Sequence, residues 1–198
     1  MNKKLKRKDI PPQRRKQIID AARALFAHRG YHGITADAIA AWSGISKGNL
    51  YWYFKSKQDI LQLLFDDIVE QLTKPSEIIL KSDISPTDKL RAFAMSHLHV
   101  AEAHPDAVSI MLQIAGQQDL KDMVSSEYLP WTRRYVDSLI PLFAAMGEKD
   151  PETVATLFSN TVDGIMAMVA MGSDIYDKEK IMAVIEERFI GFRGEKYG

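Results

Sequence analysis

The segment 35–53 limits the possible folds of this chain more than any other, because two very short helical patterns flank a single glycine in it. Thr35 and Ser46 are of the types that cap helix N-termini, and each precedes one pattern. Gly44, between the patterns, can adopt the positive φ of a tight turn, and the small Ala40 allows two helices to cross closely. We therefore predict a helix-turn-helix. Its two helices are expected over about 35–42 and 46–53.

The apolar residues of this segment indicate which side chains point outward. Ile39, Ile45 and Leu50 are spaced to form a small apolar contact between the two helices. We expect the first helix to bury Ala38 and Ile39, with Trp42 as a further candidate. With Leu50 inside, the side chains left to point elsewhere are Lys47, Gly48, Asn49, Tyr51 and Trp52.

The remainder of the chain carries helix signals as well. Ser85 and Asp150 each precede a proline that suits the first helical position, and Ser56 with Asp59 resembles a capping box. Pro75 marks the end of the helix that starts at this box, or the linker beyond it. No segment shows the alternation of a strand bounded by turns, so the predicted fold class is all-α. The other helices are expected over about 13–29, 56–74, 86–103, 105–115, 126–146, 151–172 and 178–193.

The distribution of charge divides the chain into a basic first third and an acidic remainder. Residues 1–60 carry 13 basic and four acidic side chains, a net charge of +9, although the whole chain is neutral. This asymmetry indicates a polyanionic partner for the first third. The alternative is a solvated basic tail, since five of these charges lie in residues 3–8, which either reach a minor groove or add only non-specific attraction. The predicted parts are a flexible basic arm (1–12), a helix-turn-helix domain (13–55) and a helical domain (56–198) whose helix 56–74 links the two.

Composition excludes several classes of protein. The chain has no cysteine, which excludes disulfides, zinc–thiolate sites and cysteine nucleophiles. Its longest uninterrupted apolar run, Ile165–Met171, is far shorter than the roughly 18 residues that a membrane-spanning helix needs. The basic N-terminus lacks the apolar region of a secretory signal. We expect a cytoplasmic protein with no membrane partner.

Signals for catalysis are missing from the sequence. It contains no glycine-rich phosphate loop, no nucleophile elbow and no His-Glu-x-x-His pattern. His99 and Glu102 stand three positions apart and could share a metal, but no second pair of this kind accompanies them. We therefore expect no enzyme activity, no catalytic residues, no cofactor and no metal site.

The runs Ile18–Gly30, Thr35–Ala40 and Gly44–Lys57 together resemble the N-terminal domain of TetR/AcrR-type bacterial transcription regulators. The resemblance covers about residues 13–65, and beyond residue 75 it concerns architecture alone. It implies a three-helix DNA-binding domain followed by a C-terminal helical domain for ligand binding and dimerisation. The implied partner of the first domain is double-stranded operator DNA.

The resemblance also assigns roles to residues of the helix-turn-helix. The helix that starts at Ser46 is expected to enter the major groove by its N-terminal end. Lys47 and Asn49 are the candidates for base contacts, since lysine donates to guanine acceptors and asparagine can pair with adenine. Gly48 would let the backbone approach closely, and Phe54 is expected in the core. Thr35, Tyr51 and Lys57 match positions that hold phosphates, while Trp52 and Tyr53 either contact sugar-phosphate or thymine methyls or pack in the core.

For the second domain the resemblance implies a homodimer and an effector site. The last two helices pair with their counterparts in such proteins, here through about residues 151–193, although an intramolecular core would show the same apolar stripe. An effector cavity is expected among polar, sulfur-bearing or aromatic residues within apolar helices, each of which has an ordinary core or surface role as its alternative. The candidates are Met95, His97, His99, Met111, Gln113, Trp131, Tyr135, Asn160 and Asp163.

The function expected from these features is transcriptional regulation in response to a ligand. The protein would be a repressor that leaves its palindromic operator when a small, hydrophobic molecule binds the C-terminal domain and changes the separation of the recognition helices. Repression itself follows from the resemblance alone. The alternative is a DNA-binding regulator that is controlled by a protein partner or by no effector.

Overall fold

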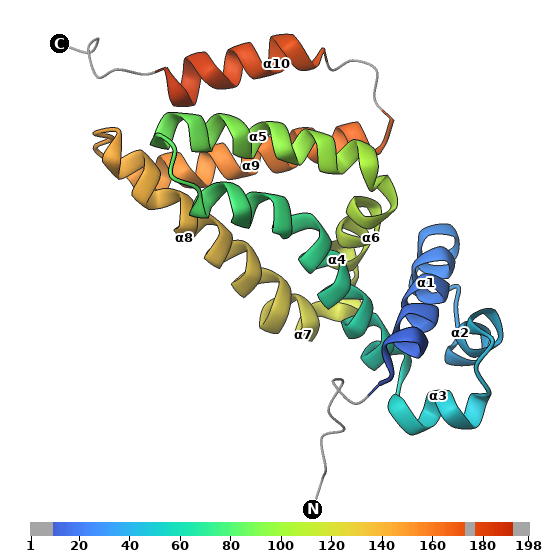
Figure 1. Ribbon diagram of the computed structural model, residues 1–198. Coiled ribbons are helices and arrows are strands. Elements are labelled where there is room, and N and C mark those ends of the chain that lie inside the picture. The colour runs from blue at the N-terminus through green and yellow to red at the C-terminus, as the bar shows by residue number, and fades with distance from the viewer. Residues whose placement is uncertain (1–9, 173–176, 192–198) are drawn as a thin grey trace, which may run out of the picture. The chain divides into compact units, whose positions relative to one another are not determined.

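The computed structural model describes residues 10–172 and 177–191, and all regular secondary structure in them is helical (Figure 1). The all-α prediction is confirmed. The charged residues of the predicted basic arm, Lys3 to Lys8, lie outside the described residues. The elements are α1 (Pro12–Arg29), α2 (Ala36–Ser43), α3 (Lys47–Tyr53), α4 (Lys57–Lys81), α5 (Pro86–Ala103), α6 (Pro105–Gly116), the 3-10 turn η2 (Gln118–Leu120), α7 (Lys121–Met123), the π-helical turn η3 (Val124–Tyr128), α8 (Leu129–Ala145), α9 (Pro151–Ala170), α10 (Lys178–Ile185) and the π-helical turn η4 (Glu186–Ile190).

These helices form two compact units. The headpiece unit comprises residues 10–71 and 110–117, and the C-terminal unit comprises residues 72–109 and 118–191. The division therefore falls inside α4, not in front of it as the predicted boundary at residues 55 and 56 has it. Two hydrogen bonds from Arg23 of α1, to Asp67 (3.2 Å) and Gln71 (2.9 Å), hold the first half of α4 in the headpiece unit.

Helix α1 begins at a proline and ends before Gly30. The φ of Gly30 is 65°, a positive value that glycine adopts more easily than other residues because it has no Cβ. Ile18, Ala22 and Leu25, at helical spacing, are almost completely buried. The helix predicted over 13–29 is present with nearly these bounds.

The predicted helix-turn-helix is present in the headpiece unit. The Thr35 hydroxyl accepts from the Ala38 N–H (3.1 Å) and caps α2, while the Ser46 hydroxyl accepts from the Asn49 N–H (3.3 Å) and caps α3. Gly44 ends α2 in the left-handed conformation, with φ of 67°. These local signals, all visible in the sequence, define both short helices.

Trp42 does not pack in the core, so this candidate for burial was wrong. Its side chain is 61% exposed, whereas Ile39, Ala40 and Ser43 of the same helix are buried. The buried face of a two-turn helix is narrow, and Trp42 lies beside that face.

Helix α4 corrects the expected end at Pro75. The capping box is present, because the Ser56 hydroxyl accepts from the Asp59 N–H (3.2 Å) and Asp59 accepts from the Ser56 N–H (3.1 Å). However, the helix continues through Pro75 to Lys81. Proline has no N–H for the carbonyl four residues earlier, that of Gln71, and its ring crowds the same carbonyl, so the helix continues through Pro75 at a local cost. Ser76, in the turn that follows, is almost completely buried in the C-terminal unit, so the helix is packed directly after the proline.

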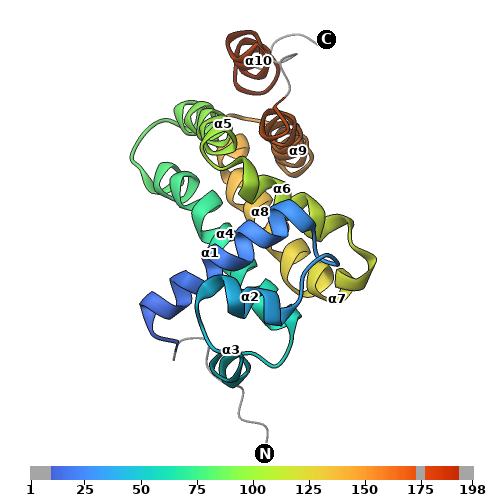
Figure 2. The same ribbon diagram turned by 90° about the vertical axis from the view of Figure 1, so that its right-hand side faces the viewer.

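Three fully buried phenylalanines form the centre of the C-terminal unit. Phe93 of α5, Phe143 of α8 and Phe158 of α9 come together where α9 packs against both other helices (Figure 1 and Figure 2). Phe158 lies 5.8 Å from Phe93 and 5.5 Å from Phe143 between ring centroids. Truncating such a residue to alanine costs about 3–5 kcal/mol, so this cluster holds the unit together.

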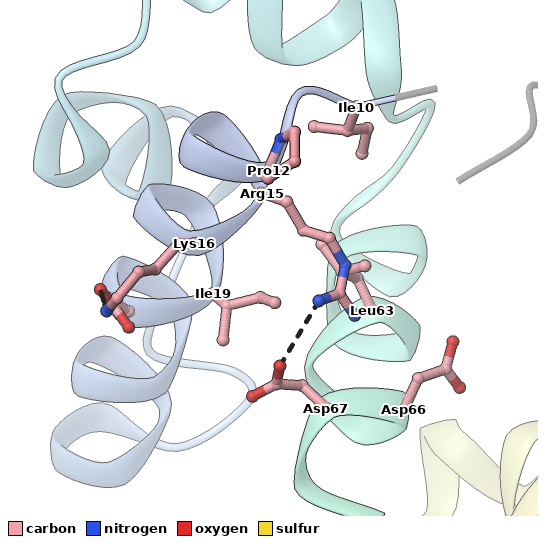
Figure 3. Close-up of a pocket in the computed structure, with 9 residues that line it drawn as sticks. Ile10, Pro12, Arg15, Lys16, Ile19, Leu63, Asp66 and Asp67 are labelled. Carbon is pink, nitrogen blue, oxygen red and sulfur yellow. Dashed lines mark hydrogen bonds and ion pairs between the residues drawn. The ribbon is translucent and has the colours of Figure 1, made fainter. Parts of the chain in front are cut away.

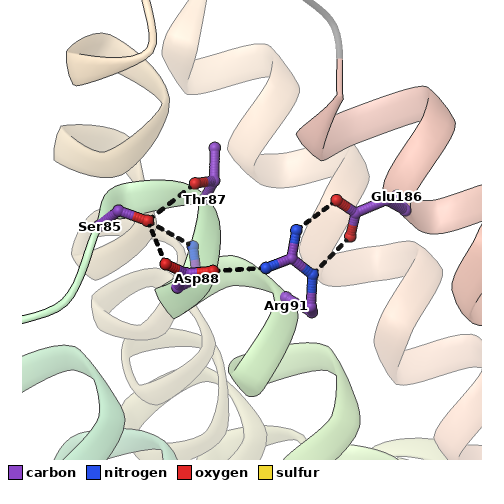
Figure 4. A network of polar contacts seen from close by, with 5 residues as sticks. All are labelled: Ser85, Thr87, Asp88, Arg91 and Glu186. Carbon is purple, nitrogen blue, oxygen red and sulfur yellow. Dashed lines mark hydrogen bonds and ion pairs between the residues drawn. The ribbon is translucent and has the colours of Figure 1, made fainter.

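A polar network joins the start of α5 to the C-terminal turn η4 (Figure 4). The Ser85 hydroxyl accepts from the Asp88 N–H (3.1 Å), and Asp88 accepts in turn from Arg91. Arg91 also donates through two nitrogens to the carboxylate of Glu186. Since this fork geometry fixes direction as well as distance, it sets the position of η4 on α5.

Candidate DNA-binding surface and effector region

Helix α3 presents almost its whole surface to solvent. Leu50 is its one buried residue and is completely covered. Tyr51 is 51% and Trp52 62% exposed, which is unusual for large rings placed side by side on one short helix. The other exposed residues of the helix are Lys47, Gly48 and Asn49.

The two aromatic residues that follow, Tyr53 and Phe54, are more buried than Tyr51 and Trp52. Tyr53 is half-buried and lies edge-on to Trp52, with ring centroids 4.9 Å apart, while Phe54 is buried as expected. Trp52 and Tyr53 therefore support each other at the end of α3, and DNA contact by either remains a prediction.

Gly48 has no reason within the chain to be glycine. Its φ is not positive, and a Cβ atom built there would meet no other atom within 4 Å. Glycine weakens a helix, so a glycine that neither backbone nor packing requires suggests a demand from outside the chain. Close approach of a bound partner to this face of α3 would be such a demand.

Asp37, in the first turn of α2, contacts two side chains of α3. Its carboxylate accepts from Lys47 Nζ at 2.7 Å and from the Tyr51 hydroxyl at 3.3 Å. The hydrogen bond from Lys47 lowers the pKa of Asp37, and the same bond raises the pKa of Lys47, so both stay charged over the physiological range. Sequence reasoning missed this bridge because nothing in the spacing of residues 37, 47 and 51 reports it.

Lys57, at the start of α4, binds the backbone of the loop before α2. Its Nζ donates to the carbonyls of Tyr31 (2.6 Å) and Ile34 (3.1 Å) and lies 4.0 Å from the centroid of the Tyr31 ring. Lys57 therefore has a structural role that the sequence did not reveal. The phosphate contacts expected of Thr35, Tyr51 and Lys57 stay predictions.

A groove of about 830 Å³ lies beside α1 and α4 in the headpiece unit (Figure 3). Four of its charged side chains form ion pairs with each other, Arg15 with Asp67 (3.6 Å) and Lys16 with Asp20 (2.6 Å). The lining residues are Ile10, Pro12, Arg15, Lys16, Ile19, Asp20, Leu63, Asp66 and Asp67. None of the residues predicted for the effector site lines this groove.

Part of the predicted effector set does come together in the C-terminal unit, around the aromatic face of α8. Trp131 stacks on Tyr135, with ring centroids 5.8 Å apart, and contacts Tyr128 at 5.7 Å. Phe93 of α5 lies 5.1 Å from Tyr135. These rings, half-buried except for the buried Phe93, form an apolar surface with hydroxyl groups at its edges.

His97 and Tyr135 form a buried polar pair at this surface. His97 is 4% exposed, and burial lowers its pKa to about 4, so the ring is neutral at pH 7. Its Nδ1 lies 2.8 Å from the Phe93 carbonyl and must carry the proton, so Nε2 accepts from the Tyr135 hydroxyl. Ser76 lies 3.5 Å from the same hydroxyl.

Asp163 of α9 places a carboxyl group near the same rings. Burial raises its pKa to about 6, and the Ser159 hydroxyl donates to it at 3.4 Å. Burial, together with the charge of Asp163, raises the pKa of Tyr128. The aromatic surface thus has hydrogen-bond acceptors of two kinds, a carboxylate and a tyrosine oxygen.

The other predicted effector residues are divided between the two units. His99 and Asn160 are exposed, and Met95 is half-buried on α5. Met111 and Gln113 belong to the headpiece unit, where the last turns of α6 lie. The grouping of residues 110–117 with the headpiece unit is a feature that periodicity alone does not show.

Helix α9 has a second apolar face that the unit does not cover. Leu157 (54% exposed), Gly164 and Met171 (64% exposed) follow each other at seven-residue spacing, and Val184 of α10 is 54% exposed. By length and composition alone, α9 is the one helix among the described residues that could cross a membrane. Its opposite face carries the buried Phe158 of the core, so α9 is a core helix with one uncovered side.

A helix-turn-helix with an exposed recognition helix, joined to a larger helical unit, defines a DNA-binding transcription regulator. The family model described as "Bacterial regulatory proteins, tetR family" matches residues 18–64. The fatty acid metabolism regulator protein of Bacillus subtilis (strain 168) is 28% identical over 167 residues, which are 81% of this chain and 86% of that protein. The HTH-type transcriptional repressor KstR2 of Mycolicibacterium smegmatis is 32% identical over 103 residues, about half of each chain (52% and 50%).

Solved structures share the fold along nearly the whole chain. The regulator FadR from Bacillus subtilis in complex with stearoyl-CoA has a TM-score of 0.72 at 23% identity, over 88% of this chain and 97% of that one. AibR in complex with isovaleryl coenzyme A and operator DNA has a TM-score of 0.70 at 19% identity, over 90% of this chain and all of that one (100%). Residues 18–64 thus match the tetR family of bacterial regulatory proteins, as the resemblance in segment 13–65 predicted, and the chain has the fold of TetR-like transcriptional regulators.

Proposed function

We propose that the protein is a dimeric repressor that holds a palindromic operator through α3 of each subunit and releases it when an acyl-coenzyme A binds the C-terminal unit. The observation that carries the DNA-binding part is α3 itself. A helix with a single buried residue, two exposed aromatic rings and an unexplained Gly48 is built to contact something outside the chain. A regulator of this kind works where the DNA of a bacterial cell is, in the cytoplasm.

The dimer is supported by the uncovered face of α9. An apolar stripe through Leu157 and Met171, continued by Val184 of α10, is the kind of surface that soluble proteins bury against a copy of themselves. A two-fold pair would place two α3 helices for two half-sites about one turn of DNA apart, which is why the operator should be palindromic.

The effector class is supported by chemistry and by relatives. The aromatic surface of Trp131 and Tyr135 suits the acyl chain of a ligand. The ring of His97 beside it suits a hydrogen bond with one polar group of that ligand. A relative is named for fatty acid metabolism, and two proteins of the same fold are bound to stearoyl-CoA and isovaleryl coenzyme A. Linkage requires that the thioester binds the DNA-free state more tightly than the DNA-bound state.

The test of the DNA-binding part is a selection of bound duplexes from a random pool at a stated salt concentration. Enrichment of a palindrome is expected. Binding that selects no sequence and vanishes as salt rises would contradict a specific operator, since that behaviour comes from phosphate attraction alone.

The test of the effector is release of that palindrome by acyl-coenzyme A thioesters of increasing chain length, with coenzyme A and the free acids as controls. Tyr135→Phe keeps the stacked ring but loses the hydroxyl that bonds to His97, so it should weaken the response. Thr132→Val is a matched control, because the Thr132 hydroxyl bonds only within α8, to the Leu129 carbonyl. Palindrome binding that no thioester weakens would favour control by a protein partner or by no effector.

A further inference from the structure

The Asp37 carboxylate lies between the two polar side chains of α3 that are expected on DNA. It is in contact with Lys47, a candidate for base contact, and with Tyr51, a candidate for phosphate contact, at 2.7 and 3.3 Å. Asp37 is also the only acidic residue between Gly30 and Gln58. A lone carboxylate in the middle of a basic DNA-binding surface repels phosphate, so its presence there calls for a compensating role.

The physical effect of the bridge is on Lys47. A free lysine is a flexible point charge that reaches whichever phosphate is nearest, and such a contact is the same on every DNA sequence. The ion pair with Asp37 balances the charge of the Lys47 ammonium and holds it at the N-terminal end of α3. The N–H groups that do not bond to Asp37 are then restricted in direction. A tethered lysine gains little from an arbitrary phosphate but can still donate to a base that arrives at the correct position.

We propose that Asp37 is a positioning residue for specificity, which keeps Lys47 available for bases and prevents it from acting as a general phosphate contact. The inference rests on the proposed DNA-binding function. It extends that function by assigning the discrimination between operator and other DNA partly to a residue that itself contacts no DNA.

The experiment measures binding of the full chain to two duplexes, the selected palindrome and a scrambled duplex of the same base composition, over a range of salt. In Asp37→Asn, Lys47 is freed to hold a phosphate on any sequence. Affinity for the scrambled duplex should rise about two- to fivefold, as expected when one exposed ion pair is exchanged for another contact. The slope of log affinity against log salt should steepen by about 0.9, the value for one added phosphate. Affinity for the palindrome should not rise, so the ratio of the two affinities falls.

Two controls isolate the bridge. Asp20→Asn removes the same charge from an exposed ion pair of similar length, Lys16–Asp20 at 2.6 Å on α1, and should leave the ratio unchanged. In a Lys47→Met background, Asp37→Asn should no longer steepen the salt dependence, because the lysine that it would free is absent. Asp37→Ser, a second neutral variant, should reproduce Asp37→Asn.

The outcomes are distinct. Equal strengthening of both duplexes by Asp37→Asn would reduce Asp37 to a general repulsive charge and overturn the inference, and so would an unchanged scrambled duplex. A steeper salt slope that persists without Lys47 would overturn it as well. If the wild-type protein shows no preference for any palindrome, the proposed function fails and this inference fails with it. A preserved preference with an unchanged ratio in Asp37→Asn refutes the inference alone.

Discussion

Gly48→Ala should separate the stability of this protein from its function. Gly48 is the second residue of α3, its φ is not positive, and an added Cβ would meet no atom within 4 Å. The methyl group therefore costs nothing in the free protein. Alanine restores helix propensity worth up to about 1 kcal/mol in a helix interior, and about 0.5 kcal/mol is expected near an N-terminus.

On DNA the same methyl group should be harmful. If the α3 backbone at Gly48 approaches the duplex closely, an added methyl group overpacks that contact, which typically costs about 1–3 kcal/mol, or roughly 5- to 150-fold in affinity. Urea unfolding followed by tryptophan fluorescence measures the first effect, and titration of the selected palindrome measures the second.

The control is Gly116→Ala, at the end of α6, where a Cβ also meets no atom within 4 Å. It should leave DNA affinity unchanged. The reasoning about Gly48 is refuted if Gly48→Ala binds the palindrome as tightly as the wild type, because α3 would then have no close approach at that residue. A loss of stability in Gly48→Ala would refute the description of its surroundings.

Three further predictions follow from contacts in the two units. Lys57→Met should lower the free energy of unfolding by about 2–4 kcal/mol in urea, because the Tyr31 and Ile34 carbonyls lose a charged donor, whereas Lys55→Met, at an exposed lysine, should change it little. Because the pKa of His97 is lowered, its contribution to the free energy of unfolding is lost as pH falls from 6.5 to about 4. Because the pKa of Asp163 is raised, its contribution is lost as pH rises from 3.8 to about 6. Relative to wild type, Asp163→Asn should therefore steepen the fall in stability on acidification, and His97→Asn should flatten it; parallel curves would contradict both assignments. Leu157→Glu should yield folded monomers in sedimentation and weaken palindrome binding, and a dimer of undiminished affinity would exclude the α9 face from the interface.

Local chemistry explains which parts of the fold were predictable. The starts of α2, α3, α4, α5 and α9 depend on a capping side chain within three residues of the bond it makes, so Thr35, Ser46, Ser56, Ser85 and Asp150 could be identified from the sequence. The end of α4 could not, because whether a helix survives Pro75 depends on the packing of the turns after it.

The candidate site divides in the same way. The exposed residues of α3 follow from the spacing of Leu50 and the turn at Gly44, which are local features. The bond from Lys57 to Tyr31 spans 26 positions and the pair His97–Tyr135 spans 38, so both depend on how helices pack. No pattern of residue types reports such a contact, and the sequence could name Tyr135 as a candidate without naming its partner.

The uncovered face of α9 has a consequence for how gene expression responds to the amount of this protein. Under the proposed dimer, and while monomers predominate, the number of DNA-binding molecules grows with the square of the monomer concentration. Operator occupancy then changes more steeply with protein level than it would for a monomeric repressor. The exposed Leu157 and Met171 would thereby set a threshold dose for silencing. Substitutions along this stripe would tune that threshold while operator sequence and effector choice stay the same.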